Sequence, residues 1–356
     1  MESLYNIVKH FDEVSLERSI ADLNNPGITR LHCLYDTLGS RSGTRIGFEF
    51  PYRSLLTTME YLDHSLVTSP SMIASNIVTS TWPVVSQLQY RIFSEHVGDT
   101  VTLCVAFLGT DTWQKVVTDI NIMESSIDWT LGGQPYHISI YSGIFTSLFS
   151  NNAAPVKEIM SVLERQMRKH PNGPAGKWRL RLGGYSLGST QILYFLCWYM
   201  SDSIQAMYPT VTSKHFKSIE CFLVASVVGT RCDELSAYIE AMRRRHHAFS
   251  LFSILQTMDI ANRAVMNLLL TRHAMSEHII IEAENNCVAL YRIPSVLIGR
   301  GIVLKSMFVV SFLNPKSFAY LANVIGLSTK NHYLVEYIAA IKSFVAKHGR
   351  KCAPRT

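Results

Sequence analysis

Near the middle of the chain, five residues have the types and spacing expected around a nucleophilic serine: Gly184-Tyr185-Ser186-Leu187-Gly188. They match G-x-S-x-G, a pattern in which the serine stands on a sharp turn between a strand and a helix. The glycines allow close approach of the backbone, and the helix N-terminus lies where negative charge develops. The flanking sequence fits, because residues 178–183 predict a strand and residues 187–200 predict a strongly apolar helix. A glycine-rich turn with an incidental serine is the alternative interpretation.

A serine hydroxyl is a weak nucleophile, so it needs a histidine to accept its proton and a carboxylate to orient that histidine. In α/β-hydrolases these groups follow the serine in the order acid, then histidine. Asp259 comes just after a strand predicted at residues 249–257 and is the candidate acid. Asp233 is the runner-up, but it begins a predicted helix, where N-capping is a sufficient explanation for an aspartate.

The candidate histidine is His332, which stands at the start of the last predicted helix. Because the chain has 13 histidines, chance is a real competitor. His273 and His278 also lie downstream of Asp259 and stay as alternatives.

Acyl transfer by such a serine passes through an oxyanion, which must be stabilised by hydrogen-bond donors aimed at it. One donor is expected to be the backbone N–H of Leu187, directly after the nucleophile. The other should come from the loop that follows the strand predicted at residues 100–108.

Apolar runs and turn signals predict strands that alternate with helices along most of the chain. Strands are expected at residues 100–108, 136–141, 178–183, 219–226, 249–257 and 287–292, and helices at residues 154–170, 187–200, 234–245, 315–325 and 332–347. This alternation predicts an α/β fold with a mainly parallel central sheet flanked by helices. Residues 1–95 read as mixed helix and loop, so we expect an N-terminal helical extension packed on a domain of residues 96–350.

The composition indicates a globular protein and argues against several kinds of ligand. The chain has 356 residues, of which 47% are hydrophobic and 17% charged, as expected for a well-packed globular core. A formal net charge of +6 suits an approach to anionic surfaces. The sequence lacks the signatures of nucleic-acid binding, and no metal-ligand cluster, phosphate-binding loop or dinucleotide fingerprint is visible. We therefore expect no nucleic-acid partner, no metal and no cofactor.

Other features concern the cellular compartment. The seven cysteines are odd in number and include no C-x-x-C pair, which favours a reducing compartment. The start of the chain does not resemble a signal peptide, and the most apolar stretch, residues 293–313, carries two basic residues. We expect a protein that is cytoplasmic or peripheral at an intracellular membrane. The basic run at residues 243–247 is either a solvated helix end or a contact for an anionic membrane.

Several motifs together resemble the class 3 lipases, the fungal triacylglycerol lipase type. The family's G-H-S-L-G-G is similar to residues 184–189, with Tyr185 in place of the histidine. Its F-R-G-T resembles Phe107-Leu108-Gly109-Thr110, and its V-H-x-G-F resembles residues 141–145. Its G-S-P-R-V-G resembles residues 225–229, where the proline is lost, and its N-D-x-V segment aligns at Asp259. The motifs keep the family's order over roughly residues 95–345.

This resemblance implies an α/β-hydrolase fold and a Ser186–His332–Asp259 triad. It places Thr110 as the second oxyanion donor. Residues next in the chain have the spacing of one apolar helix face, which the family uses as a mobile lid over its active site. With Tyr185, they are the lid and substrate-binding candidates: Trp113, Val116, Val117 and Ile120.

The resemblance further implies a lipid ester substrate, with the acylglycerol lipases as the leading class. A membrane or lipid-droplet surface is a second expected partner, and the oligomeric state is left open. A phospholipase or small-ester esterase is one alternative. A catalytically silent, lipase-like lipid-binding protein is the other, motivated by the departures at Leu108, Tyr141, Tyr185 and Val227.

Overall fold

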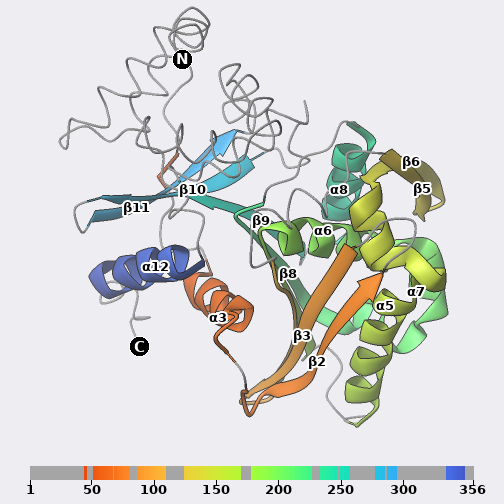
Figure 1. Ribbon diagram of the computed structural model, residues 1–356, viewed down its shortest axis with the longest axis horizontal. Coiled ribbons are helices and arrows are strands. Elements are labelled where there is room, and N and C mark those ends of the chain that lie inside the picture. The colour runs from red at the N-terminus through yellow and green to blue at the C-terminus, as the bar shows by residue number, and fades with distance from the viewer. Residues whose placement is uncertain are drawn as a thin grey trace, which may run out of the picture. The chain divides into compact units, whose positions relative to one another are not determined.

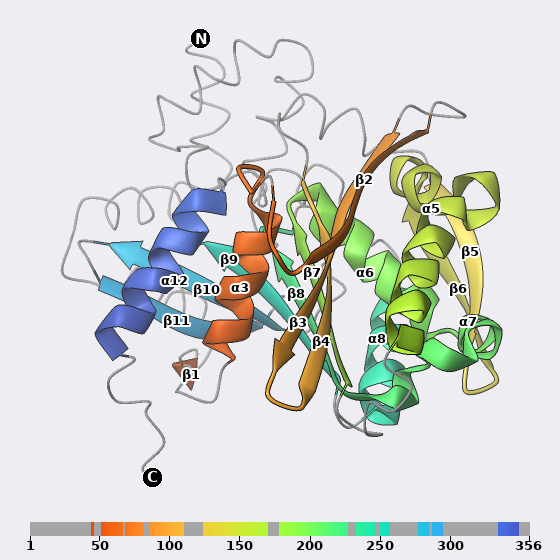
Figure 2. The ribbon, with the colours of Figure 1, turned by 90° about the horizontal axis from the view of Figure 1, so that it is seen from below.

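A computed structural model describes residues 44–45, 51–66, 68–80, 86–109, 124–169, 178–226, 233–246, 249–256, 277–284, 287–294 and 334–348. The chain divides into two compact units, one of residues 53–253 and one of residues 1–52 with 254–356. The ribbon is shown in Figures 1 and 2. No helix in the described ranges is both long and apolar enough to cross a bilayer.

The unit of residues 53–253 is built on a sheet with the strand order β2-β3-β4-β7-β8-β9. Its central strands β4 (Thr100–Phe107), β7 (Trp178–Tyr185) and β8 (Phe216–Val224) run parallel. Their inward-facing residues are buried, as expected for parallel strands covered on both faces. The central part of the fold is therefore the α/β arrangement that the sequence predicts.

One edge of this sheet differs from the prediction. Residues 72–97, expected to be helix and loop, form the antiparallel strands β2 (Met72–Ser80) and β3 (Ser86–Val97) beside β4. The prediction was wrong here because β2 is half exposed and rich in Ser, Thr and Asn, so it lacks an apolar run. The predicted division of the chain at residue 95 stays a prediction, and most of residues 1–50 lie outside the described ranges.

Helices cover both faces of the sheet, as Figure 2 shows. On one face lie α5 (Ser142–Lys169), which is broken at residues 150–153, and α6 (Leu187–Met200). On the other face lies α3 (Tyr52–Leu62), whose Thr58 packs directly on Gly183 of β7. All fourteen residues of α6 are buried, which explains its continuous apolar sequence.

A hairpin outside the main sheet covers the helices α6 and α8 (Asp233–Arg245). Its strands β5 (Glu124–Leu131) and β6 (Gln134–Tyr141) pair only with each other, so residues 136–141 form the predicted strand but not in the central sheet. Trp129 of the hairpin packs against Tyr238 and Tyr194, with ring centroids 5.8 and 6.5 Å apart. These aromatic contacts fix the hairpin on the helices.

Short elements join α6 to β8: α7 (Asp202–Met207), η1 (Pro209–Val211) and η2 (Ser213–His215). In the second unit, β10 (Glu277–Glu284) pairs parallel with the last residues of β9 (Phe249–Gln256). It also pairs antiparallel with β11 (Cys287–Pro294), which in turn pairs with β1 (Thr44–Arg45). The helix α12 (Leu334–His348) closes the described chain, and the helix predicted at residues 315–325 lies outside the described ranges.

Candidate active site

Ser186 stands at the junction of β7 and α6, on the backbone turn that the motif predicts. Its φ and ψ are 53° and −123°, a conformation that L-residues rarely adopt and glycine adopts readily. Holding a serine there costs on the order of 1–3 kcal/mol, so the surrounding structure must impose it. Strain of this kind clusters at functional sites, although strain alone does not establish one.

Three hydrogen bonds hold this turn. The N–H of Ser186 donates to the carbonyl of Val224 at the end of β8, at 2.9 Å. The carbonyl of Ser186 accepts from the N–H of Ser189 at 3.0 Å and from its hydroxyl at 2.5 Å. The position of Ser186 is thus set both by the next strand and by the first turn of its own helix.

Both motif glycines are needed because there is no room for a side chain at either position. A Cβ placed on Gly184 would lie 2.3 Å from the carbonyl oxygen of Gly188 and 2.5 Å from Cα of Ser189. A Cβ on Gly188 would lie 2.3 Å from the carbonyl oxygen of Phe107, the last residue of β4. Because no side chain fits at either position, the tight packing of the turn accounts for the G-x-S-x-G spacing.

The end of β4 lies directly against the serine. A Cβ on Gly109 would be 2.7 Å from the carbonyl oxygen of Tyr185 and 3.0 Å from Cβ of Ser186. The chain that leaves β4 towards Thr110 therefore starts in contact with the nucleophile turn. The sequence predicts the oxyanion loop after this strand, but nothing in it indicates the contact through Gly109.

A second strained residue follows β8, the strand that holds Ser186. Ala225 has a φ of 53° and is fully buried, and Ser226 beside it is also buried. The carboxyl ends of β4, β7 and β8 therefore meet around Ser186. The signal for this in the sequence was the Ala225-Ser226 match to a family motif, although nothing in it identified Val224 as the hydrogen-bond partner.

The surroundings of Ser186 are apolar and closed. Ser186 is 1% exposed, Leu187 is 2% exposed and Tyr185 is 7% exposed. Leu187 is the first residue of α6, where backbone N–H groups lack partners within the helix. Such a position provides partial positive charge next to the serine.

Buried polar groups fix α6 further along. The side-chain amide of Gln191 donates to the carbonyl of Gln87 at 2.9 Å and to the hydroxyl of Ser147 at 3.0 Å. These bonds tie the nucleophile helix to β3 and α5. By contrast, the buried hydroxyl of Thr190 has no hydrogen-bond partner among the described residues.

The other predicted site residues lie outside the described ranges: Asp259, His332, Thr110, Trp113, Val116, Val117 and Ile120. The elements next to two of them are as predicted. The strand β9 ends three residues before Asp259, and α12 begins two residues after His332. Of the alternatives, Asp233 is the first residue of α8 and His278 lies in β10.

The described ranges contain no cluster of histidine, cysteine and carboxylate side chains able to hold a metal ion. Cys104, Cys197 and Cys221 are buried free thiols. Burial raises the pKa of Cys104 to about 12 and raises the pKa of the other two as well. These thiols therefore stay protonated and belong to the core, as their apolar context predicts.

Two lipases are among the solved structures that the chain distantly resembles. A lipase from Rhizopus microsporus var. chinensis is 14% identical, with a TM-score of 0.43, over 68% of this chain and 76% of that one. A triacylglycerol lipase from Penicillium expansum is also 14% identical, with a TM-score of 0.40, over 67% of this chain and 81% of that one. No family model matches the chain, and no curated protein matches it in sequence.

Proposed function

We propose that the chain is a serine ester hydrolase of the α/β-hydrolase fold that acts on a lipid ester, with Ser186 as its nucleophile. The observation that carries the proposal is the strained backbone of Ser186, held between β7 and a buried helix by glycines that admit no side chain. Such a turn presents a hydroxyl at the carboxyl end of a central strand, where α/β folds place their sites.

In the proposed reaction, Ser186 attacks the acyl carbonyl while His332 accepts its proton. Asp259 orients the imidazole and stabilises its charged form. The N–H groups of Leu187 and Thr110 bind the oxyanion. His332 then protonates the leaving alcohol, and a water activated by His332 hydrolyses the acyl-enzyme to release the acid.

The lipid substrate is proposed from the family resemblance and from the burial of the serine. A nucleophile that is 1% exposed must be uncovered before an ester reaches it. The amphipathic segment with Trp113, Val116, Val117 and Ile120 is the proposed lid, which an apolar interface would draw away. Triacylglycerols or other acylglycerols are the proposed substrates, and Tyr185 is proposed to line the substrate's path.

Labelling with a fluorophosphonate probe tests the nucleophile. Wild type should be labelled in the presence of detergent, and Ser186→Ala should not. Ser213→Ala is the matched control, because Ser213 is also buried and lies 3.5 Å from a histidine nitrogen, that of His246. Labelling that survives in Ser186→Ala, or that is absent from wild type, would reject the proposed nucleophile.

Turnover tests the remaining roles. Hydrolysis of tributyrin should rise sharply above its solubility limit if a lid responds to an interface. Asp259→Asn should lower kcat by about 10⁴-fold, as loss of the orienting carboxylate does in serine hydrolases. Unchanged turnover in Asp259→Asn would instead direct attention to Asp233.

A further inference from the structure

Basic side chains gather at one end of the unit of residues 53–253. The end in question is where the parallel strands begin, and Figure 2 shows the β3–β4 hairpin and the helices α7 and α8 reaching it. The helix α5 ends shortly before β7, and η2 leads directly into β8. The exposed cations at this end are Arg165, Arg168, Lys169, Lys214, Lys217, Arg244 and Arg245.

Contacts join two of these elements, η2 and the end of α8. The hydroxyl of Ser213 in η2 lies 3.5 Å from Nε2 of His246, just after α8. Burial lowers the pKa of His246, and the charges of Arg245 and Lys214 lower it further, so both cations lie close to it. The same end therefore carries a positive field across η2 and α8.

Three acidic side chains near this end form ion pairs with arginines. Glu164 pairs with Arg168 at 2.8 Å, Asp202 with Arg245 at 3.0 Å, and Glu240 with Arg243. Asp99 in the β3–β4 turn is a further acid there. Within the described ranges, five of the exposed cations have no acidic partner: Arg165, Lys169, Lys214, Lys217 and Arg244.

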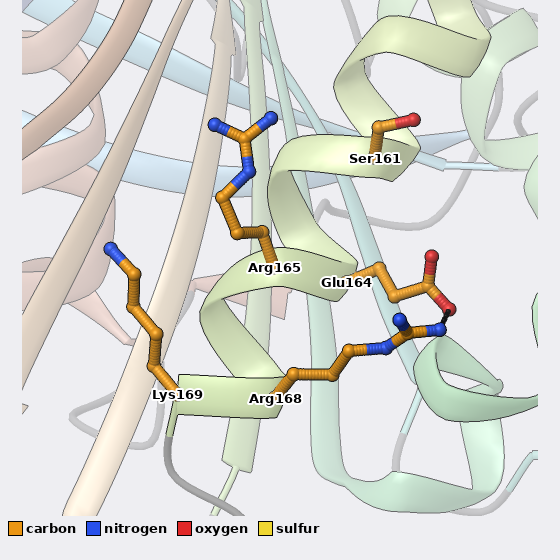
Figure 3. Close-up of a pocket in the computed structure, with 5 residues that line it drawn as sticks. All are labelled: Ser161, Glu164, Arg165, Arg168 and Lys169. Carbon is orange, nitrogen blue, oxygen red and sulfur yellow. Dashed lines mark hydrogen bonds and ion pairs between the residues drawn. The ribbon is translucent and has the colours of Figure 1, made fainter.

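The end of α5 shows how these cations are presented. An open pocket of about 410 Å³ is lined by Ser161, Arg165 and Lys169 together with the Glu164–Arg168 pair. In Figure 3, Arg165 and Lys169 extend on one side of the helix, away from that pair. Two long cationic side chains beside an open pocket suit a phosphate-bearing group.

Helix dipoles explain only part of this pattern. Cations in the last turns of α5 and α8 are favourable against the helix C-termini. Lys214 and Lys217 lie instead in a short 3-10 turn and at the start of a strand, where no such dipole acts. Two large apolar side chains are exposed at the last residues of two elements, Val97 of β3 at 73% and Met207 of α7 at 56%.

We propose that this end of the unit is a docking surface for an anionic lipid bilayer. Cations spread over several elements match a flat layer of anionic headgroups better than they match a single ligand. The exposed Val97 beside this end could reach the boundary between headgroups and acyl chains. The surface does not involve the candidate active site.

The geometry of docking follows from the direction of the strands. Ser186 lies at the carboxyl end of β7, and the basic surface lies at the amino end. A chain bound in this way holds its serine turned away from the bilayer. Docking is therefore separate from the opening of a lid, and it does not depend on the proposed function.

Cosedimentation of the full chain with vesicles tests the proposal. Wild type should bind vesicles of phosphatidylcholine mixed with phosphatidylglycerol, should bind pure phosphatidylcholine poorly, and should be released by salt. Lys169→Glu with Arg244→Glu should weaken binding by about tenfold or more. Ser186→Ala should bind as wild type does.

The matched control is Arg53→Glu with Lys157→Glu, which changes the net charge equally. Arg53 is in the first turn of α3, and Lys157 is twelve residues before Lys169, about 18 Å along the helix. The control pair should bind nearly as wild type does. Equal loss in both pairs, or equal binding of wild type to both kinds of vesicle, would overturn the proposal. Lys214→Gln with Lys217→Gln, which only neutralises charge, replaces the test pair if that pair fails to fold.

Discussion

The N–H of Ser186 donates a 2.9 Å hydrogen bond to the carbonyl of Val224, so the turn with the candidate nucleophile is held by the strand next to its own. Both residues lie at carboxyl ends of parallel strands, where such strands meet at one edge of the sheet. The bond joins residues that are far apart in sequence, and it stabilises a backbone conformation that the local sequence alone disfavours.

The first prediction concerns the spacing around that turn. Gly184→Ala should lower the free energy of unfolding by about 1–3 kcal/mol and abolish fluorophosphonate labelling, because its Cβ would meet backbone atoms of Gly188 and Ser189. Urea denaturation measures the first effect. Gly98→Ala is the control: its φ is also positive, at 57°, but its Cβ would have nothing within 4 Å. If both variants lose the same stability, steric crowding at Gly184 is not the cause.

A second prediction concerns how α3 packs on the nucleophile strand. A Cβ on Gly183 would meet Cγ2 of Thr58, so Gly183→Ala should be destabilising. Thr58→Ser removes that methyl group and keeps a hydroxyl, which in Thr58 donates to the carbonyl of Ser54 at 2.7 Å. The double variant should be more stable than the two single changes predict, by about 1 kcal/mol in a double-mutant cycle. Strict additivity would count against this contact.

The third prediction is a pH dependence of stability from Asp202. Desolvation acts to raise its pKa, but hydrogen bonds from the N–H groups of Gly133 and Gly132, together with Arg245, outweigh it and lower the pKa below the ordinary 3.8. A lowered pKa in the folded state adds stability above 3.8 that is lost as the pH falls through the folded-state pKa.

Asp202→Asn should therefore destabilise the protein at neutral pH. The difference in stability between this variant and wild type should become smaller at acidic pH. Urea midpoints of both proteins across this range are the measurement. A difference that stays constant with pH would mean that the charge of Asp202 plays no part.

A fourth prediction uses the buried hydroxyl of Thr190, which has no partner in the described structure. Thr190→Val keeps the shape and removes an unsatisfied polar group, so it should raise the free energy of unfolding by about 1 kcal/mol. Thr58→Val is the comparison, since it removes a hydroxyl that does donate, and it should lower stability. Destabilisation by Thr190→Val would indicate that an ordered water bonds the hydroxyl.

Parts of the fold that depend on local signals were predicted well. The helix α6 has the bounds that its apolar run and the preceding motif predict. The second part of α5 also begins near the predicted residue 154, because positive φ values at Asn151, Asn152 and Ala153 break the helix before Pro155. In both cases short-range sequence decides where a helix begins.

Non-local pairing was harder to predict. The strand β5 was missed, although Ile127, Trp129 and Leu131 alternate with polar residues before a Gly132-Gly133 turn with positive φ values. This alternation followed by a Gly-Gly turn is a hairpin signal in the sequence. For β2 the signal was weak, because it is an edge strand with one exposed face and few apolar residues. The strand β3 is an inner strand, and the alternation of its buried Leu88, Tyr90 and Ile92 with polar residues was a signal in the sequence.

For the candidate site, sequence predicted Ser186 and the strand and helix beside it. It did not predict the contacts of Gly109 and Val224, because these depend on how the ends of three strands meet. The catalytic roles of Ser186, Asp259, His332 and Thr110 stay predictions.

The backbone of Ser186 also has a consequence for stability. At a φ of 53° and a ψ of −123°, glycine would adopt the backbone conformation with less strain, so Ser186→Gly should make the protein more stable than wild type. The side chain at this position therefore lowers the stability of the fold. For the proposed nucleophile, this is a trade of stability for activity.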